Sequence, residues 1–141
     1  MGYSMSDLSP SQLAAQAHVN VTTIRFYERR GLLPEPSRRE SGYRRYPVGA
    51  VQRIHFIKRA QELGFTLEQI RELLALDESE TTTCADVRHR AEQHLADVRQ
   101  KFRMLGRMEK VLTSLVEQCP GEGIATECPI LSTLNPIRRK L

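Results

Sequence analysis

The sequence has no tryptophan, and phenylalanine and tyrosine together make up only 6% of its 141 residues. No apolar stretch comes near the roughly 18 residues that a membrane-spanning helix needs, so we expect no membrane segment and no membrane partner. The first residues, MGYSMSDLSP, do not combine a basic region with an apolar stretch, so we expect no signal peptide. These expectations predict a cytoplasmic protein, and the length predicts one compact unit.

Disulfide and catalytic signatures are also missing. The three cysteines are an odd number in a chain for which we expect reducing surroundings, and this argues against a disulfide framework. We find no Ser–His–Asp arrangement and no paired carboxylates at a catalytic spacing. We therefore predict that the protein is not an enzyme, and we assign no catalytic or cofactor-binding residue.

Positive charge is concentrated in one segment. The net charge is only +4, yet residues 25–59 carry ten Lys or Arg against three Glu. Residues 60–141 carry eleven bases against thirteen acids. The local excess predicts a surface for a polyanion such as nucleic acid, although a solvated basic face without a partner would have the same composition.

The first third of the chain predicts a winged helix-turn-helix. Residues 9–19 predict a short helix with Ser9 as its N-cap, and residues 21–30 predict a second one after a break. Residues 34–46 contain two prolines and the motif GYRRY, and they predict a β-hairpin that turns at residues 40–42. Two short helices followed by a hairpin are typical of this DNA-binding unit.

The remaining chain is predicted to be helical. Residues 48–63 and 66–76 predict two helices, and residues 128–134 predict a short one. Residues 84–119 predict the longest helix, in which one heptad position reads Cys84, Ala91, Val98, Leu105, Leu112 and Cys119. We predict a mainly α-helical fold with a small β-hairpin wing and a long antiparallel coiled-coil dimerisation helix, although this seam would also allow packing against another segment of the same chain.

The second short helix has a face suited to DNA. Thr22, Arg25 and Arg29 are three or four residues apart and share one face. Arginine can donate to guanine in the major groove, and threonine can contact a thymine methyl group or a phosphate. We expect Tyr27 to donate its hydroxyl to a phosphate. The apolar residues are left to pack against the core: Val21, Ile24 and Phe26.

The GYRRY motif predicts a second DNA contact. Alternation along a strand places Tyr43 and Arg45 on one face, and Arg44 and Tyr46 on the other. Arginine and tyrosine on a wing suit phosphate contacts and an approach to the minor groove.

The cysteine spacing predicts a site shared by two chains. Cys84 and Cys119 are 35 positions apart, so a continuous helix separates them by about 50 Å, and they cannot bind one ion within a single chain. In an antiparallel dimer centred near residues 101–102, Cys84 of one chain meets Cys119 of the other. Cys128 follows after a glycine-containing loop that can fold back. We therefore predict two symmetry-related sites with three thiolates each.

The ligand type narrows the choice of metal. Thiolates select soft ions, whereas zinc normally takes four ligands, and no His, Cys, Asp or Glu follows Cys128. Three thiolates suit an ion with trigonal sulfur coordination, such as Hg(II) or Pb(II). We divide the chain into a winged helix-turn-helix domain (1–47), a linking helix pair with its linker (48–82), a dimerisation helix (83–119) and a metal-binding loop with a short helix and tail (120–141).

The run VTTIRFYERRGLLPEP, followed by GYRRY and a long helix, resembles the DNA-binding half of MerR-type regulators. The cysteine spacing, with CPGEGIATECPI around the last two, resembles the mercury-responsive branch, and lead-responsive relatives share it but tend to carry further cysteines. The similarity covers residues 8–134. One departure is His18, because many members have glycine in that turn; if the turn needs a positive φ, histidine costs more than glycine.

The resemblance implies a homodimer on double-stranded operator DNA within the promoter of mercury-resistance genes. Without metal the protein would repress, and with metal it would distort the DNA so that RNA polymerase can open it. The resemblance implies metal-binding roles for Cys84, Cys119 and Cys128. It implies DNA-contacting roles for Thr22, Arg25, Tyr27, Tyr43, Arg44 and Tyr46.

Other interpretations stay open on the residues alone. The same type of regulator would respond to Pb(II), Cd(II) or Zn(II) if the metal preference differs. Oxidation of Cys119 with Cys128 would instead make the protein a thiol redox sensor. A metal-buffering protein without gene control is a further interpretation, but it gives no purpose to the basic helix at residues 21–30.

Overall fold

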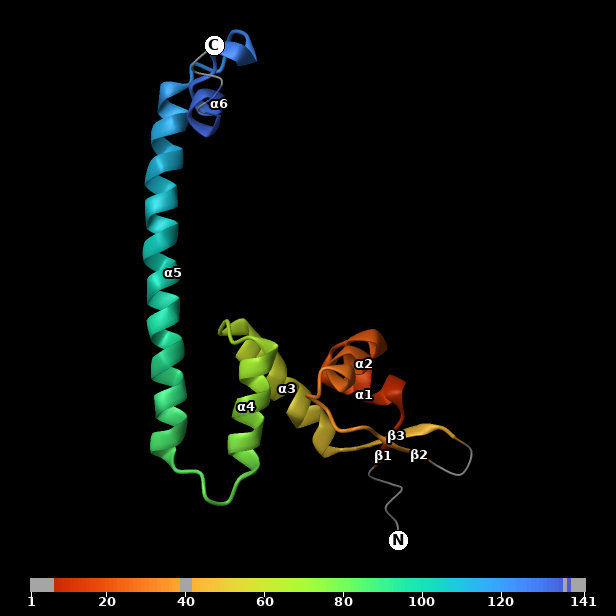
Figure 1. Ribbon diagram of the computed structural model, residues 1–141. Helices are drawn as coiled ribbons and strands as arrows, with labels where there is room; N and C mark the ends of the chain where they lie inside the picture. The colour runs from red at the N-terminus through yellow and green to blue at the C-terminus, as the bar shows by residue number, and fades with distance from the viewer. Residues whose placement is uncertain (1–6, 39–41, 136, 138–141) are drawn as a thin grey trace. The chain divides into compact units, whose positions relative to one another are not determined.

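The computed structural model describes residues 7–38, 42–135 and 137 (Figure 1). The chain divides into two compact units, Met1–Ala91 and Glu92–Leu141, and helix α5 (Cys84–Gln118) continues from one into the other. Within the described residues, none of the helices has the length and apolar character that crossing a membrane requires.

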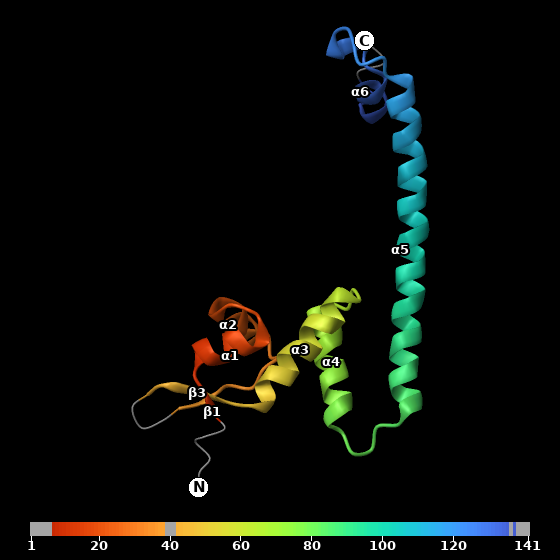
Figure 2. The same cartoon turned by 180° about the vertical axis from the view of Figure 1, so that it is seen from behind.

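The predicted helix-turn-helix is present in the first unit as α1 (Pro10–Ala17) and α2 (Val21–Arg29) (Figure 2). Ser9 caps α1 as predicted: its hydroxyl accepts a hydrogen bond from the Gln12 backbone N–H at 3.2 Å, and its own N–H donates to Gln12 Oε1 at 2.9 Å. Such a cap stabilises a helix by about 1 kcal/mol, so the start of α1 is decided by four consecutive residues.

The turn between α1 and α2 requires the left-handed conformation. His18 has φ 57°, and it is the one non-glycine residue with positive φ in the described part of the chain. Its carbonyl oxygen accepts a hydrogen bond from Lys58 Nζ at 3.3 Å. Asn20 then caps α2 by accepting a hydrogen bond from the Thr23 backbone N–H at 2.7 Å. The turn therefore does need a positive φ, and it holds histidine, which is less favourable there than glycine.

A small antiparallel sheet forms the wing. The strands β2 (Ser37–Arg38) and β3 (Arg44–Pro47) pair with Ser37 opposite Arg45, which confirms the predicted hairpin. Of its predicted turn, residues 40 and 41 lie outside the described residues. A third strand, β1 (Asp7–Leu8), pairs with the other side of β3 and was not predicted, because two residues are too few to show an alternating pattern.

Two further helices complete the first unit, α3 (Gly49–Glu62) and α4 (Leu67–Glu78), close to their predicted limits. Thr66 caps α4, because its hydroxyl accepts a hydrogen bond from the Gln69 backbone N–H at 3.1 Å. The core joins α1, α2, α3 and α4 to the loop after α2. Its largest fully buried side chains are Leu13, Ile24, Leu32, Ile54, Ile57 and Ile70.

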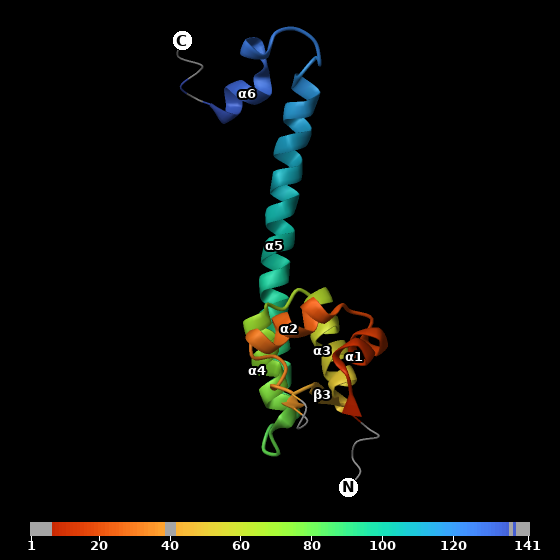
Figure 3. The same ribbon diagram turned by 90° about the vertical axis from the view of Figure 1, so that its right-hand side faces the viewer.

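The second unit contains most of α5, a short 3-10 helix η2 (Ala125–Glu127) and α6 (Pro129–Leu134), which was predicted. After α5 the chain turns back, and α6 lies beside the last turns of α5 (Figures 1 and 3). Leu115 is only 7% exposed, and it lines a hollow together with Thr133 and Leu134. One apolar residue of α5 is therefore covered within its own chain.

Candidate DNA-binding surface and cysteine sites

The exposed face of α2 carries the side chains predicted to contact DNA. Thr22, Arg25 and Arg29 are all exposed, as their spacing predicts. Within the described part of the chain, neither arginine has an ion-pair partner. Two cations on one helix face that form no ion pair with another described residue suit an anionic partner, because no acidic side chain in that part of the chain compensates their charge.

The roles expected for two neighbouring aromatic residues are exchanged in the structure. Tyr27 is only 4% exposed, and its hydroxyl donates a hydrogen bond to Gln61 Oε1 at 2.9 Å. Burial raises the pKa of Tyr27 above its usual value. Phe26 is 37% exposed, so the expectation that it packs in the core is wrong. The ring of Tyr27 belongs to the core, and the hydroxyl expected to reach a phosphate is already bonded within the chain.

Glu28 links α2 to the wing. Its side chain is 8% exposed, and one carboxylate oxygen accepts a hydrogen bond from Arg44 Nη1 at 2.5 Å. The other accepts a hydrogen bond from the hydroxyl of Tyr46, which is 2% exposed. A buried carboxylate needs such partners, because leaving it unpaired away from water costs several kcal/mol. Arg44 and Tyr46 therefore hold α2 against β3, a role that the DNA-contact prediction did not include.

The titration properties of this cluster follow from its hydrogen bonds. Burial, and then the hydrogen bond to Glu28, raise the pKa of Tyr46. Hydrogen bonds to Tyr46 and to Glu28 raise the pKa of Arg44.

Alternation along β3 did place Arg44 and Tyr46 on one face, as predicted. Nothing local in the sequence pointed to Glu28, which lies 16 residues before Arg44.

The residue immediately before β3 has its side chain directed to solvent. Tyr43 is 72% exposed. Arg45 Nη2 instead donates a hydrogen bond to the backbone oxygen of Asp7 at 2.9 Å, which fastens β3 to β1. Tyr43 is thus the predicted wing residue that the structure leaves most accessible.

The three cysteines form no disulfide, and they lie at the two ends of α5 and at the start of α6. Cys84 is exposed and is the first residue of α5, and half-buried Cys119 follows its last residue. Cys128 is half-buried and is the N-cap residue of α6. Across the described residues, no group of three or more His, Cys, Asp or Glu side chains could hold a metal ion within this one chain. The structure does not bring the three predicted ligands together in a single chain.

The start of α5 is fastened to the DNA-binding unit. The Thr83 backbone N–H donates to Asp86 Oδ2 at 3.0 Å, and the Asp86 backbone N–H donates to Thr83 Oγ1 at 3.2 Å. Hydrogen bonds from the backbone N–H and then from the side chain of Thr83 lower the pKa of Asp86. Two turns into the helix, Arg90 forms an ion pair with Glu72 of α4. Cys84 therefore lies between the Thr83–Asp86 cap and the ion pair of Arg90 with Glu72 of α4.

Two family models match the chain and overlap along it. The model described as "MerR HTH family regulatory protein" matches residues 8–77, and the model described as "MerR, DNA binding" matches residues 51–115. A mercuric resistance operon regulatory protein from Bacillus cereus is 46% identical over 87% of this chain and 93% of its own length. A protein of the same name from Serratia marcescens is 44% identical over 96% of this chain and 92% of its own length.

A solved structure has a similar fold over most of the chain. It is the crystal structure of the transcription regulator PbrR691 from Ralstonia metallidurans CH34 in complex with lead(II), which is 37% identical to this chain. The match covers 91% of this chain and 99% of the other, with a TM-score of 0.80.

Proposed function

The chain belongs to the MerR family of transcriptional regulators, which are not enzymes, and on this basis we propose that it is a homodimer on operator DNA with Hg(II) as its inducer. The names of the Bacillus and Serratia relatives support mercury. The lead(II) complex of the structural relative keeps Pb(II) as the nearest alternative. The observation that carries the proposal is the position of Cys84 and Cys119 at the two ends of one helix.

The DNA contacts proposed for the chain come from α2 and the wing. Thr22 and Arg25 would contact bases or phosphates in the major groove, and Tyr43 would contact a phosphate from the wing. Glu28 and Tyr46 engage one nitrogen of Arg44, so other N–H donors of its guanidinium remain for a phosphate. Tyr27 and Tyr46 would act indirectly, by holding α2 and β3 in place.

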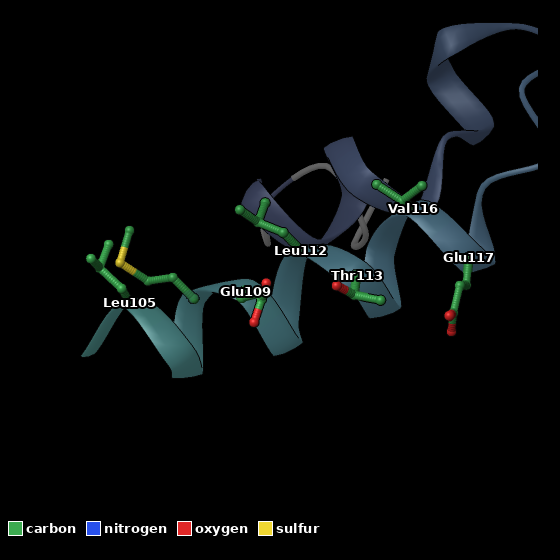
Figure 4. A pocket seen from close by; sticks show the side chains of 7 residues that line it. Leu105, Glu109, Leu112, Thr113, Val116 and Glu117 are labelled. Atoms are coloured by element: carbon green, nitrogen blue, oxygen red, sulfur yellow. The ribbon is translucent and has the colours of Figure 1, made fainter. Parts of the chain in front are cut away.

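Exposed apolar side chains along α5 support a second copy of the chain as its partner. Leu105, Leu112 and Val116 lie along one side of the helix (Figure 4), and each is more than half exposed. Large exposed apolar surfaces on a folded chain mark interaction sites. The exposed apolar residues of α5 are Val87, Leu95, Val98, Phe102, Met104, Leu105, Met108, Val111, Leu112 and Val116.

The proposed metal site combines both chains of this dimer. Antiparallel pairing of two α5 helices would bring Cys84 of one chain to Cys119 and Cys128 of the other. The donor set fits a soft ion, because all three side chains are thiols that form no disulfide. The bound ion would supply a covalent link between the two chains at each end of the paired helices.

The link between α5 and α4 supports a route from metal to DNA. Fixing Cys84 to the partner chain would fix the first turns of α5, which the Arg90–Glu72 ion pair joins to α4. Helix α4 packs on α3 through the buried side chains of Ile70 and Leu74. The two DNA-binding units would then move as a pair and distort the operator, so that RNA polymerase can open a promoter that the metal-free protein represses.

A competition titration tests this proposal. The reduced dimer is titrated with Hg(II), Pb(II), Cd(II) and Zn(II) against a competing small thiol, and thiolate–metal absorption is followed. The wild type is compared with Cys84→Ser, and His89→Gln is the matched control, because His89 is an exposed possible ligand near Cys84 that the proposal does not use. Operator binding is measured for each variant without metal.

We expect Hg(II) to survive competition in the wild type and in His89→Gln, and to be lost in Cys84→Ser. Operator binding should be the same in all three proteins. Retention of Hg(II) by Cys84→Ser would contradict the shared site. If another ion alone survives competition, the inducer is that ion and not Hg(II).

A further inference from the structure

Phe26 occupies a position that core packing does not explain. Of the two adjacent aromatic residues on α2, the one with a hydroxyl is buried and the purely apolar one is 37% exposed. Burying tyrosine requires a hydrogen-bond partner, which Gln61 supplies, whereas burying phenylalanine requires none. The opposite arrangement would be easier to pack, so the exposed ring is available to a partner outside the chain.

The ring lies within the face already assigned to DNA. Phe26 follows Thr22 by four residues, so the two side chains are neighbours on the helix surface. Arg25 and Arg29, both exposed, belong to the same exposed face. The guanidinium carbon of Arg30 lies 5.7 Å from the centre of the Phe26 ring, within the range of a cation–π contact. The ring is therefore surrounded by groups that attract a polyanion, and Arg30 limits its orientations.

The chemistry of the major groove identifies what such a ring can contact. A phenyl ring has no hydrogen-bond donor or acceptor, so it cannot read the polar edges of bases or bind a phosphate. The 5-methyl group of thymine is the apolar feature of the major groove, and phenylalanine is among the side chains that contact it. We propose that Phe26 determines operator specificity by packing against a thymine methyl group in each half-site. This inference rests on the proposed function, because it needs α2 in the major groove.

Substitution of single thymines by deoxyuridine tests the inference, because this change removes the methyl group and keeps every hydrogen-bonding edge. The probes are duplexes that the full-length protein itself selects from a randomised DNA library. Each thymine is replaced in turn, symmetrically in both half-sites, and affinities are measured for the wild type, Phe26→Ala and Phe26→Leu. The Phe26 side chain is only partly exposed, so its replacement could disturb packing. Circular dichroism and the unfolding midpoint therefore check that each variant keeps the fold.

We expect one symmetric pair of replacements to weaken wild-type binding by about fourfold for each half-site, the effect of removing one buried methyl-sized group. Phe26→Ala should bind more weakly and show no further loss at that pair, whereas Phe26→Leu should keep part of the sensitivity. Equal sensitivity in the wild type and Phe26→Ala, or none at any thymine, overturns the inference while leaving DNA binding intact. Failure of the wild type to select any duplex overturns the proposed function itself.

Discussion

Replacing Tyr27 with phenylalanine separates a core role of this residue from a DNA-contacting role. The change deletes one neutral hydrogen bond, the 2.9 Å contact from the hydroxyl to Gln61 Oε1, and leaves the buried ring in place. Such a bond contributes about 1 kcal/mol. The Gln61 side chain is exposed and can rebind water, so we predict a loss of about 0.5–1 kcal/mol in the free energy of unfolding. Operator affinity should stay within about twofold.

The assay is urea unfolding followed by circular dichroism at one fixed protein concentration, because the stability of a dimer depends on concentration. Operator affinity is measured on the same samples. Tyr43→Phe is the matched control: its side chain is 72% exposed on the wing, so it should leave unfolding unchanged and weaken operator binding by about fivefold, the loss of one hydrogen bond. If Tyr27→Phe, like this control, leaves unfolding unchanged and weakens operator binding, Tyr27 acts as a DNA contact and not through the core.

Three further predictions concern contacts that join parts of the first unit. Glu28→Gln should lower the free energy of unfolding by about 2 kcal/mol, because Arg44 and Tyr46 lose a shared charged acceptor; an unchanged urea midpoint would contradict this. The raised pKa of Tyr46 means that the unfolded chain ionises first, so stability should fall as the pH rises above 10.0. Tyr46→Phe should make that fall in stability shallower, and an equally steep fall would refute the assignment of this pH dependence to Tyr46. Glu72→Gln breaks the half-exposed ion pair with Arg90, so stability should change by less than about 1 kcal/mol. Metal-dependent transcription from an operator-bearing promoter should decrease in this variant, and full induction would rule out the route through α4.

Features decided within one turn of the chain could be predicted from the sequence. The cap at Ser9 depends on a residue three positions later, and it is confirmed. The start and end of α5 were predicted within one residue, because a heptad pattern without proline runs between Thr83 and Pro120. The positive φ of His18 could be stated only as a condition, since it depends on how α1 and α2 pack.

Features decided by distant partners could not be predicted. Positions 26 and 27 are adjacent on a helix and both aromatic, so periodicity alone does not tell which one enters the core. The choice depends on Gln61, which lies 34 residues after Tyr27. The pairing of Glu28 with β3 spans 16 to 18 residues in the same way. For the cysteines, the sequence predicted that one chain cannot assemble the site, but their meeting depends on a second chain.

The central claim is that each metal site takes Cys84 from one chain and Cys119 with Cys128 from the other, and a mixed dimer tests it most directly. Cys84→Ser is co-expressed with a chain carrying both Cys119→Ser and Cys128→Ser, each with its own purification tag. The mixed dimer then has all three thiols at one end of the paired helices and none at the other. We predict that it retains one Hg(II) against a competing thiol and that neither parent homodimer retains any. A mixed dimer that binds no Hg(II), beside a wild type that does, would contradict the shared site.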